Sequence, residues 1–281
     1  MLSLHTNTAS LTIQNALSTN QAALNNSMTR LGTGYRINSA ADDAAGLQIA
    51  TRLSAQTSGM AVASQNTQNG ISLVQTADGA FDEFSNILVR MKDLATQSAD
   101  GAATADDRTA LDQEYTSLVA ELNNIFTNTT YGGEALFATG GKLAASISFQ
   151  IGATSAESMD VDVSGDLTTL SGLITAGGAV ADGDLTSQTA ANTLIDTLAD
   201  ALDSVGTVRS SLGAAQNRLT HVANNLNNMQ TNTSDAAGRI MDVDYASETA
   251  NMSQQNILMQ ASTSMLKQSS EMSQMVLSLL Q

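Results

Sequence analysis

Neither cysteine nor proline occurs in this chain of 281 residues. Without cysteine, no disulfide can form, and no thiolate can act as a nucleophile or as a metal ligand. Without proline, no slow X-Pro isomerisation delays folding. Both absences suit a chain that passes unfolded through a narrow conduit and refolds quickly, although chance and a bias toward helix would give the same composition.

Aromatic residues and histidines are also scarce, at 3% and two positions, His5 and His221. Without a His-Glu-x-x-His motif or a second histidine near either one, a zinc hydrolase has no ligand set. Serine, threonine and carboxylates are plentiful, but the sequence places no general base beside any hydroxyl. We therefore predict no catalytic residues, no cofactor and no metal, and expect a protein that is not an enzyme.

Two short motifs resemble binding loops only in part. Residues 32–34 (GTG) are a fragment of a phosphate-binding loop, but no apolar strand precedes them and the lysine is missing, so a helix stop is expected. Asp160, Asp162 and Asp166 resemble the opening of a calcium loop, yet Ser171 stands where glutamate is required. We read this second segment as a strand with one polar face.

Long apolar runs are absent as well, since no stretch approaches the roughly 18 residues of a membrane span. The first residues have neither the basic region nor the continuous apolar core of a secretory signal peptide. We expect no membrane partner and no cleaved signal peptide. An extracellular location would then require another export route.

Charge is concentrated in the middle of the chain. Residues 78–203 hold 20 of the 27 acidic residues and only 4 of the 11 basic ones, so this window carries the whole formal net charge of −16. Like charge repels nucleic acid and anionic lipid, whereas the neutral flanks can be buried densely. In an assembly of many copies, we expect the middle of the chain to form the solvent-exposed exterior and the two ends to form the interior, from which water is excluded.

Both ends carry helical stripes of apolar residues that neither end can bury by itself. Near the start the spacing is four, seven, four and three residues, and near the finish the stripe keeps one heptad phase. These stripes predict helices that pack among copies of the same chain. The predicted inner packing residues are Ile13, Leu17, Leu24, Met28, Leu31, Met252, Met259, Leu266 and Leu280.

Methionine is frequent in the last of these helices, at positions 252, 259, 265, 272 and 275. Unbranched thioether side chains tolerate slightly different packings of the same neighbours. Such tolerance would help an assembly with several packing states. Ordinary core filling accounts for the same residues equally well.

Three more stripes predict long helices between the ends. The first lies within residues 58–99 and would span about 60 Å at about 1.5 Å per residue. The second, from Leu111 to Ile125, follows an acidic first turn and should pack back on the first as a hairpin. The third alternates spacings of three and four without a break from Val205 to Met229. The fold class predicted is mainly α, with long antiparallel rods forming an elongated bundle.

Between residues 127 and 188 the apolar period changes to two, as at Ile147, Phe149 and Ile151. A second alternation covers Met159, Val161 and Val163, and glycine pairs recur. This pattern predicts short strands and turns.

The predicted order of segments along the chain is an inner helix at 1–33, a connector at 34–57, rod at 58–137, a variable β region at 138–189, rod at 190–230, a connector at 231–245 and an inner helix at 246–281.

Several segments resemble bacterial flagellin, and they occur in order at both ends. They are GYRINSA at 34–40, DDAAG at 42–46, NGIS at 69–72, DLATQS at 93–98, LGAAQNR at 212–218, NMS at 251–253 and VLSLL at 276–280. The resemblance covers about residues 1–152 and 190–281, which suggests a short flagellin without large outer domains. Asp93, Ala41 and Gln281 depart from the usual family pattern.

The resemblance implies a structural subunit that polymerises into the extracellular flagellar filament used for swimming, with terminal helices packed as coiled coils. It also implies unfolded export by the flagellar type III apparatus, assembly beneath a cap protein next to hook-junction proteins, and a chaperone that holds the C-terminal helix. Arg90, Leu94 and Glu114 match the family motif recognised by a vertebrate Toll-like receptor, although contacts between subunits would account for them as well.

Two alternatives remain open at this point. A hook-filament junction protein shares the terminal helices, and a count of copies on the cell surface would separate it from the filament subunit. A flagellin with a metalloprotease in its variable region would need the absent His-Glu-x-x-His and a longer middle.

Overall fold

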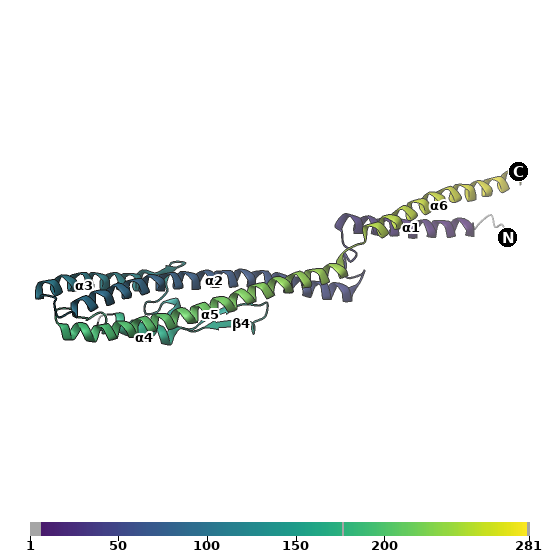
Figure 1. The fold of residues 1–281 in the computed structure, drawn as a ribbon. Coiled ribbons are helices and arrows are strands. Elements are labelled where there is room, and N and C mark those ends of the chain that lie inside the picture. The colour runs from purple at the N-terminus through teal and green to yellow at the C-terminus, as the bar shows by residue number, and fades with distance from the viewer. Residues whose placement is uncertain (1–6, 176, 280–281) are drawn as a thin grey trace. The chain divides into compact units, whose positions relative to one another are not determined.

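The computed structural model describes residues 7–175 and 177–279, and within them the chain is mainly α-helical, as predicted (Figure 1). Six α-helices, one short 3-10 helix (Lys142–Ala144) and two small antiparallel hairpins account for its regular structure in those ranges. The chain divides into two compact units. Unit 1 contains residues 1–57 and 231–281, and unit 2 contains residues 58–230.

Three helices build most of unit 2: α2 (Ala44–Ser98), α3 (Ala105–Asn128) and α5 (Gln188–Met241). Their apolar stripes meet in one core, and the side chains of Leu88 and Val208 are fully buried in it. The predicted hairpin of α2 and α3 is confirmed at its turn, where the Arg108 guanidinium donates to the carbonyl oxygens of Ser98 and Asp100, both at 2.9 Å.

A capping box starts α3. The Thr104 hydroxyl accepts a hydrogen bond from the Asp107 N–H at 3.2 Å, and the Asp107 carboxylate accepts one from the Thr104 N–H at 3.0 Å. This arrangement satisfies backbone donors that the first turn of a helix leaves without partners. The acidic first turn predicted at Asp106 and Asp107 is therefore confirmed.

Four of the five phenylalanines gather at one place in unit 2. Phe81 and Phe137 have ring centroids 4.7 Å apart, and Phe84 and Phe126 have theirs 6.3 Å apart. Aromatic rings bury large areas and prefer such tilted or edge-on contacts. The chain thus uses four of its nine aromatic residues to join α2 and α3 to the segment that follows.

The predicted small β region is present as two short hairpins. Strands β1 (Thr130–Tyr131) and β2 (Glu134–Ala135) form a hairpin around two glycines with positive φ, at 132 and 133. Strands β3 (Ile147–Gln150) and β4 (Ser158–Val161) pair antiparallel, with Phe149 opposite Met159.

A helix in the middle of the chain, α4 (Ser164–Ile174), was not predicted. The alternation that includes Val163 ends before this helix, because Val163 is its N-cap residue. Leu167, Leu170 and Ile174 are buried at helical spacing, but three positions are too few to separate helix from turn in the sequence. The predicted short strands of residues 138–189 are thus accompanied by a helix that the apolar pattern did not reveal.

The connectors are shorter than the sequence suggests. Helix α2 begins at Ala44, and helix α5 continues to Met241. Helix α6 (Tyr245–Leu279) starts after only three further residues. Most of each predicted connector is therefore helix, because alanine, glutamine and arginine in these segments are good helix formers.

Unit 1 contains α1 (Thr8–Thr33), α6 and the segments next to them. The predicted stop after α1 is confirmed, since Gly34 has φ 79° and its N–H donates to the Arg30 carbonyl at 2.9 Å. Among the described residues, none of the helices combines the length and the apolar character needed to cross a membrane.

Candidate assembly interface

Helices α1 and α6 pack against each other along a heptad pattern. Buried and half-buried positions recur at alternating spacings of three and four residues on both helices, which is the repeat of a coiled coil. On α1 these positions are Ser10, Ile13, Leu17, Asn20, Leu24, Ser27 and Leu31; on α6 they are Glu248, Met252, Gln255, Met259, Ser262, Leu266 and Ser269. We call this set of residues the seam. About half of its positions are polar, so it is less apolar than the core of unit 2.

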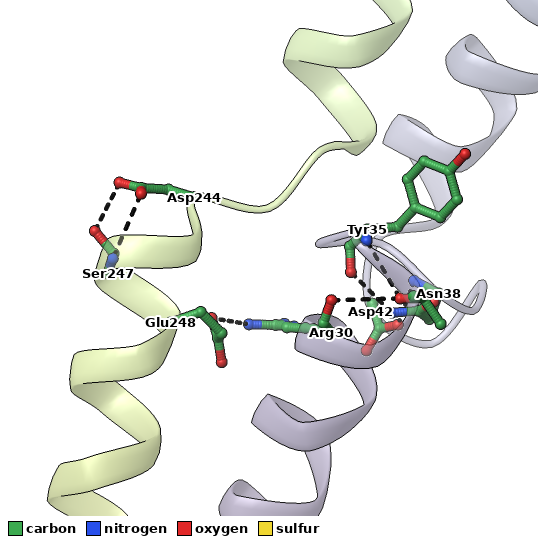
Figure 2. A network of polar contacts seen from close by, with 8 residues as sticks. Arg30, Tyr35, Asn38, Asp42, Asp244, Ser247 and Glu248 are labelled. Carbon is green, nitrogen blue, oxygen red and sulfur yellow. Dashed lines mark hydrogen bonds and ion pairs between the residues drawn. The ribbon is translucent and has the colours of Figure 1, made fainter.

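Two polar contacts near the ends of the seam show that the two helices run antiparallel. The Asn7 side-chain amide donates to the Ser269 hydroxyl at 3.1 Å, and the Arg30 guanidinium lies 3.6 Å from the Glu248 carboxylate. Figure 2 shows the second contact, which joins the end of α1 to the beginning of α6. Glu248 is only 7% exposed, so its carboxylate is largely shielded from water and lies beside the Arg30 guanidinium.

Seven of the nine residues predicted for inner packing lie on the seam, where α1 and α6 of one chain cover each other. Met28 instead lies on the outside, 48% exposed, and Leu280 is outside the described residues. The structure thus brings together the stripes that neither end could bury alone. Whether these residues also pack inside a filament stays a prediction.

The chain segments that follow α1 and precede α6 are tied together by backbone hydrogen bonds. The Arg36 N–H donates to the Met241 carbonyl at 2.6 Å, and the Val243 N–H donates to the Gly34 carbonyl at 3.0 Å. These bonds form an isolated antiparallel bridge. The Arg36 guanidinium adds a 2.8 Å bond to the Ile240 carbonyl, so residues far apart in sequence fix each other.

Two aspartates shape these segments (Figure 2). The Asp42 carboxylate accepts hydrogen bonds from the Asn38 and Ser39 N–H groups at 3.0 and 2.9 Å, and the Asn38 bond is the main reason that the pKa of Asp42 is lowered. The Asp244 carboxylate accepts from the Ser247 hydroxyl at 2.8 Å, which lowers the pKa of Asp244 most. Both carboxylates therefore act as charged acceptors that stabilise tight turns.

A second apolar stripe on α6 stays exposed after α1 and α6 have paired. Leu258, Met265 and Met272 are 40%, 57% and 55% exposed and repeat every seven residues, and Ile257 beside them is 65% exposed. We call these four residues the outer stripe. On α1, Leu11 is 52% exposed. Exposed apolar residues that line up along one helix mark an interaction surface rather than scattered surface variation.

The outer stripe was not predicted from the sequence. Its signal was present in the heptad spacing of Leu258, Met265 and Met272, but two stripes side by side on one helix look like a single wide apolar face until the partner helix is known. The high methionine content was evident, whereas its division between the seam and the outer stripe was not.

In unit 2, the three residues predicted for receptor recognition separate into two groups. Arg90 and Glu114 form an exposed ion pair between α2 and α3, with nitrogen to oxygen distances of 2.6 and 2.9 Å. Leu94 is only 1% exposed and belongs to the core. Leu94 is not accessible in the subunit, because its position on α2 faces the buried side. Recognition through these three residues stays a prediction.

The other residues singled out in the sequence lie apart from any cluster. His221 is exposed on α5, and His5 is outside the described residues. The Asp162 carboxylate accepts a bond from the Ser164 hydroxyl at 2.7 Å, which lowers the pKa of Asp162 most and places this residue at the start of α4. In the described part of the chain, no group of three or more histidine or acidic residues is arranged to hold a metal ion.

Comparison with known proteins agrees with this architecture. The model for the bacterial flagellin N-terminal helical region matches residues 4–141, and the model for the bacterial flagellin C-terminal helical region matches residues 195–280. Flagellin of Halalkalibacterium halodurans is 42% identical over 253 residues, which cover 90% of each chain. Flagellin A of Vibrio anguillarum is 34% identical over 380 residues, with 100% of both chains covered.

A solved structure is similar as well. The crystal structure of Bacillus cereus flagellin superposes with a TM-score of 0.50 at 33% sequence identity, covering 58% of this chain and 88% of that one. All of these proteins are named flagellins. The comparisons therefore favour a filament subunit, and nothing in them favours the hook-filament junction protein.

Proposed function

This chain belongs to the bacterial flagellin family and is a structural subunit of the flagellar filament, and we propose that the α1–α6 pair of unit 1 supplies its polymerisation surface. The observation that supports this is the outer stripe, since Ile257, Met265 and Met272 are all more than half exposed although the seam is already closed. In a polymer these side chains would be covered by the same helices of neighbouring copies. Flagellin homologues form the extracellular filament, and their role is structural rather than catalytic.

The charge distribution supports the same arrangement. Unit 1 holds seven acidic and five basic residues, whereas unit 2 holds twenty acidic and six basic ones. Close packing of many copies costs least where net charge is small, because like charges repel more strongly in a dry contact than in water. Unit 1 is thus suited to an inner layer and unit 2 to a surface in contact with water. A contact between different surfaces whose rotation does not close then gives an open helical polymer.

Polymerisation of the purified chain tests the proposal. The double variant Ile257→Gln/Leu258→Gln places two amides on the outer stripe without touching the seam. We expect its critical concentration for polymerisation, measured by sedimentation and electron microscopy, to rise about tenfold or more, since each buried apolar side chain contributes about 1.5–3 kcal/mol. A matched control, Thr168→Gln/Thr169→Gln, changes two exposed residues of α4 in unit 2 and should polymerise normally. Equal effects of the two double variants would remove the support for this surface.

We further propose that the chain leaves the cell unfolded through the flagellar type III apparatus without a cleaved signal peptide. Its α6 helix would be held by an export chaperone until a cap protein directs assembly onto the hook-junction proteins. The outer stripe supports this, because a subunit with an exposed apolar helix face must be kept from associating before export. A chaperone bound to that face would prevent the association. Binding of the chaperone to the wild-type chain, and not to Ile257→Gln/Leu258→Gln, is the expected result in a pull-down. A secreted chain whose mass lacks N-terminal residues would contradict export without cleavage.

We also propose that a Toll-like receptor contacts Arg90 and Glu114, which are exposed, and that Leu94 supports them from the core. In a receptor reporter assay, Arg90→Ala should lower the response, whereas Leu94→Ala should lower the thermal stability of unit 2 as well. A response unchanged by Arg90→Ala would leave these residues with a role inside the flagellin alone.

A further inference from the structure

The methionines of this chain differ sharply in exposure. Met60, Met91 and Met159 are between 0% and 3% exposed in unit 2, whereas Met265 and Met272 on the outer stripe of α6 are 57% and 55% exposed. The two exposed residues are one heptad apart, so they lie on the same face of the helix. The side chains of Met265 and Met272 are therefore accessible to small solutes in the free subunit, on the face proposed to become dry upon assembly. Met28 and Met275 of unit 1 are exposed as well, at 48% and 61%.

A thioether combines low polarity with high reactivity toward two-electron oxidants. Oxidation to the sulfoxide converts a flexible apolar side chain into a polar and chiral one, and methionine sulfoxide reductases reverse the change. Leucine or isoleucine would fill an apolar contact without this liability. The outer stripe instead carries methionine at two of its four positions.

We propose that Met265 and Met272 form a redox modification site, at which oxidation by a peroxide blocks addition of the free subunit to the polymer. The inference rests on the proposed function, because it assigns a regulation to the same outer stripe. In each step the thioether sulfur attacks one oxygen of hydrogen peroxide, an S–O bond forms as the O–O bond breaks, and the remaining oxygen leaves as water with both protons. The sulfur loses two electrons, and the peroxide gains them.

The position of Met265 and Met272 on the assembly face explains why oxidation should have a large effect on polymerisation. A sulfoxide oxygen is a strong hydrogen-bond acceptor, and in a dry contact between helices it would lose its water without gaining a donor. Met265 and Met272 share the outer stripe with Ile257 and Leu258, which are also exposed apolar residues. Oxidation of the free chain therefore leaves the fold of unit 2 intact but makes the assembly face too polar to be buried between copies. Once assembled, the same sulfurs would be covered and protected.

The test uses the purified full-length chain treated with hydrogen peroxide and then freed of it. Peptide mass spectrometry should show sulfoxide at positions 265 and 272 before it appears at positions 60, 91 and 159. At that stage the thermal unfolding of unit 2 should be unchanged, and the critical concentration for polymerisation should rise about tenfold. Treatment with methionine sulfoxide reductases should restore the original critical concentration.

Two variants separate this site from general oxidative damage. Met265→Leu/Met272→Leu keeps the stripe apolar and should polymerise normally both before and after peroxide. Met229→Leu removes an exposed methionine of unit 2, 36% exposed, and should remain as sensitive as the wild type. Sensitivity that persists in Met265→Leu/Met272→Leu, or polymerisation of sulfoxide-containing chain at the original concentration, would overturn the inference. Failure of the untreated wild type to polymerise would instead overturn the proposed function.

Discussion

The hydroxyl of Tyr115 on α3 donates a 2.6 Å hydrogen bond to the backbone carbonyl oxygen of Val180, in the segment between α4 and α5. Tyr115 is only 1% exposed, and burial is the main reason that the pKa of its phenol is raised far above the ordinary value of 10.0. The phenol therefore stays protonated and keeps donating at any ordinary pH. One side chain fastens the irregular middle of the chain to the helical part of unit 2.

Replacement of Tyr115 by phenylalanine should reveal the strength of this bond. The ring would still fill its space, but the Val180 carbonyl would lose its donor in a buried place, which costs about 1–3 kcal/mol. We expect a lower thermal midpoint of unit 2 and faster amide exchange in residues 177–185. A variant as stable as the wild type would mean that water or another donor reaches Val180.

Two glycines near the end of α1 should respond to alanine in opposite ways. Gly34 has φ 79°, where a Cβ atom is strained, and an added Cβ would lie 3.1 Å from the Tyr245 hydroxyl. Gly34→Ala should therefore destabilise unit 1 by about 1–2 kcal/mol. Gly32 lies within α1 with open space around it, so Gly32→Ala should stabilise the helix by about 0.5–1 kcal/mol.

Hydrogen exchange along α1 measures both changes, and each variant serves as the control of the other. Protection of α1 should fall in Gly34→Ala and rise in Gly32→Ala. The same direction in both variants would contradict the assignment of Gly34 to the left-handed cap.

Acid should weaken the fold through carboxylates whose pKa is lowered. The Thr104 hydroxyl donates to Asp107 at 2.7 Å and is the main cause of the lowered pKa of Asp107, whose ordinary value is 3.8. Because the folded pKa lies below this ordinary value, which applies to the unfolded chain, the stabilisation is fully present above about pH 4 and is lost as pH falls through the folded pKa.

Thermal unfolding between pH 7 and pH 2 checks this dependence. The midpoint should be nearly constant at neutral pH and should fall below about pH 4. Asp107→Asn removes the titrating group, so this variant should start with a lower midpoint and lose less of it between pH 4 and pH 2. Parallel curves for the two proteins would show that Asp107 contributes nothing to the acid sensitivity.

Much of the fold was predictable from apolar spacing alone. The unbroken stripe from Val205 to Val222 predicted the core face of α5, because a 3.6-residue period sustained over several turns is typical of a helix and not of a strand. Helix α4 escaped prediction because its three buried positions span fewer than three turns. Local patterns of that length are decided by tertiary contacts, which the sequence does not display.

The interface was predictable only in part for a related reason. A stripe shows that a helix face will be buried, but it does not tell which partner buries it. Leu24 and Met259 were predicted to pack among copies, whereas in the structure each lies on the seam within one chain. Leu94 was grouped with Arg90 and Glu114 through the family motif. Leu94 lies four residues from Arg90, yet the small rotation between positions four apart on a helix separates a buried side chain from an exposed one.

The contacts of Asn7 with Ser269 and of Arg30 with Glu248 limit how α1 can slide along α6. Any other alignment that keeps leucines and methionines inward must jump by a whole heptad, about 10 Å at about 1.5 Å per residue, and would break both contacts at once. Intermediate displacements would bring serine and asparagine opposite the apolar side chains. Under tension along their axes, α1 and α6 would therefore not slide gradually past each other. They would keep this alignment until the two helices separate.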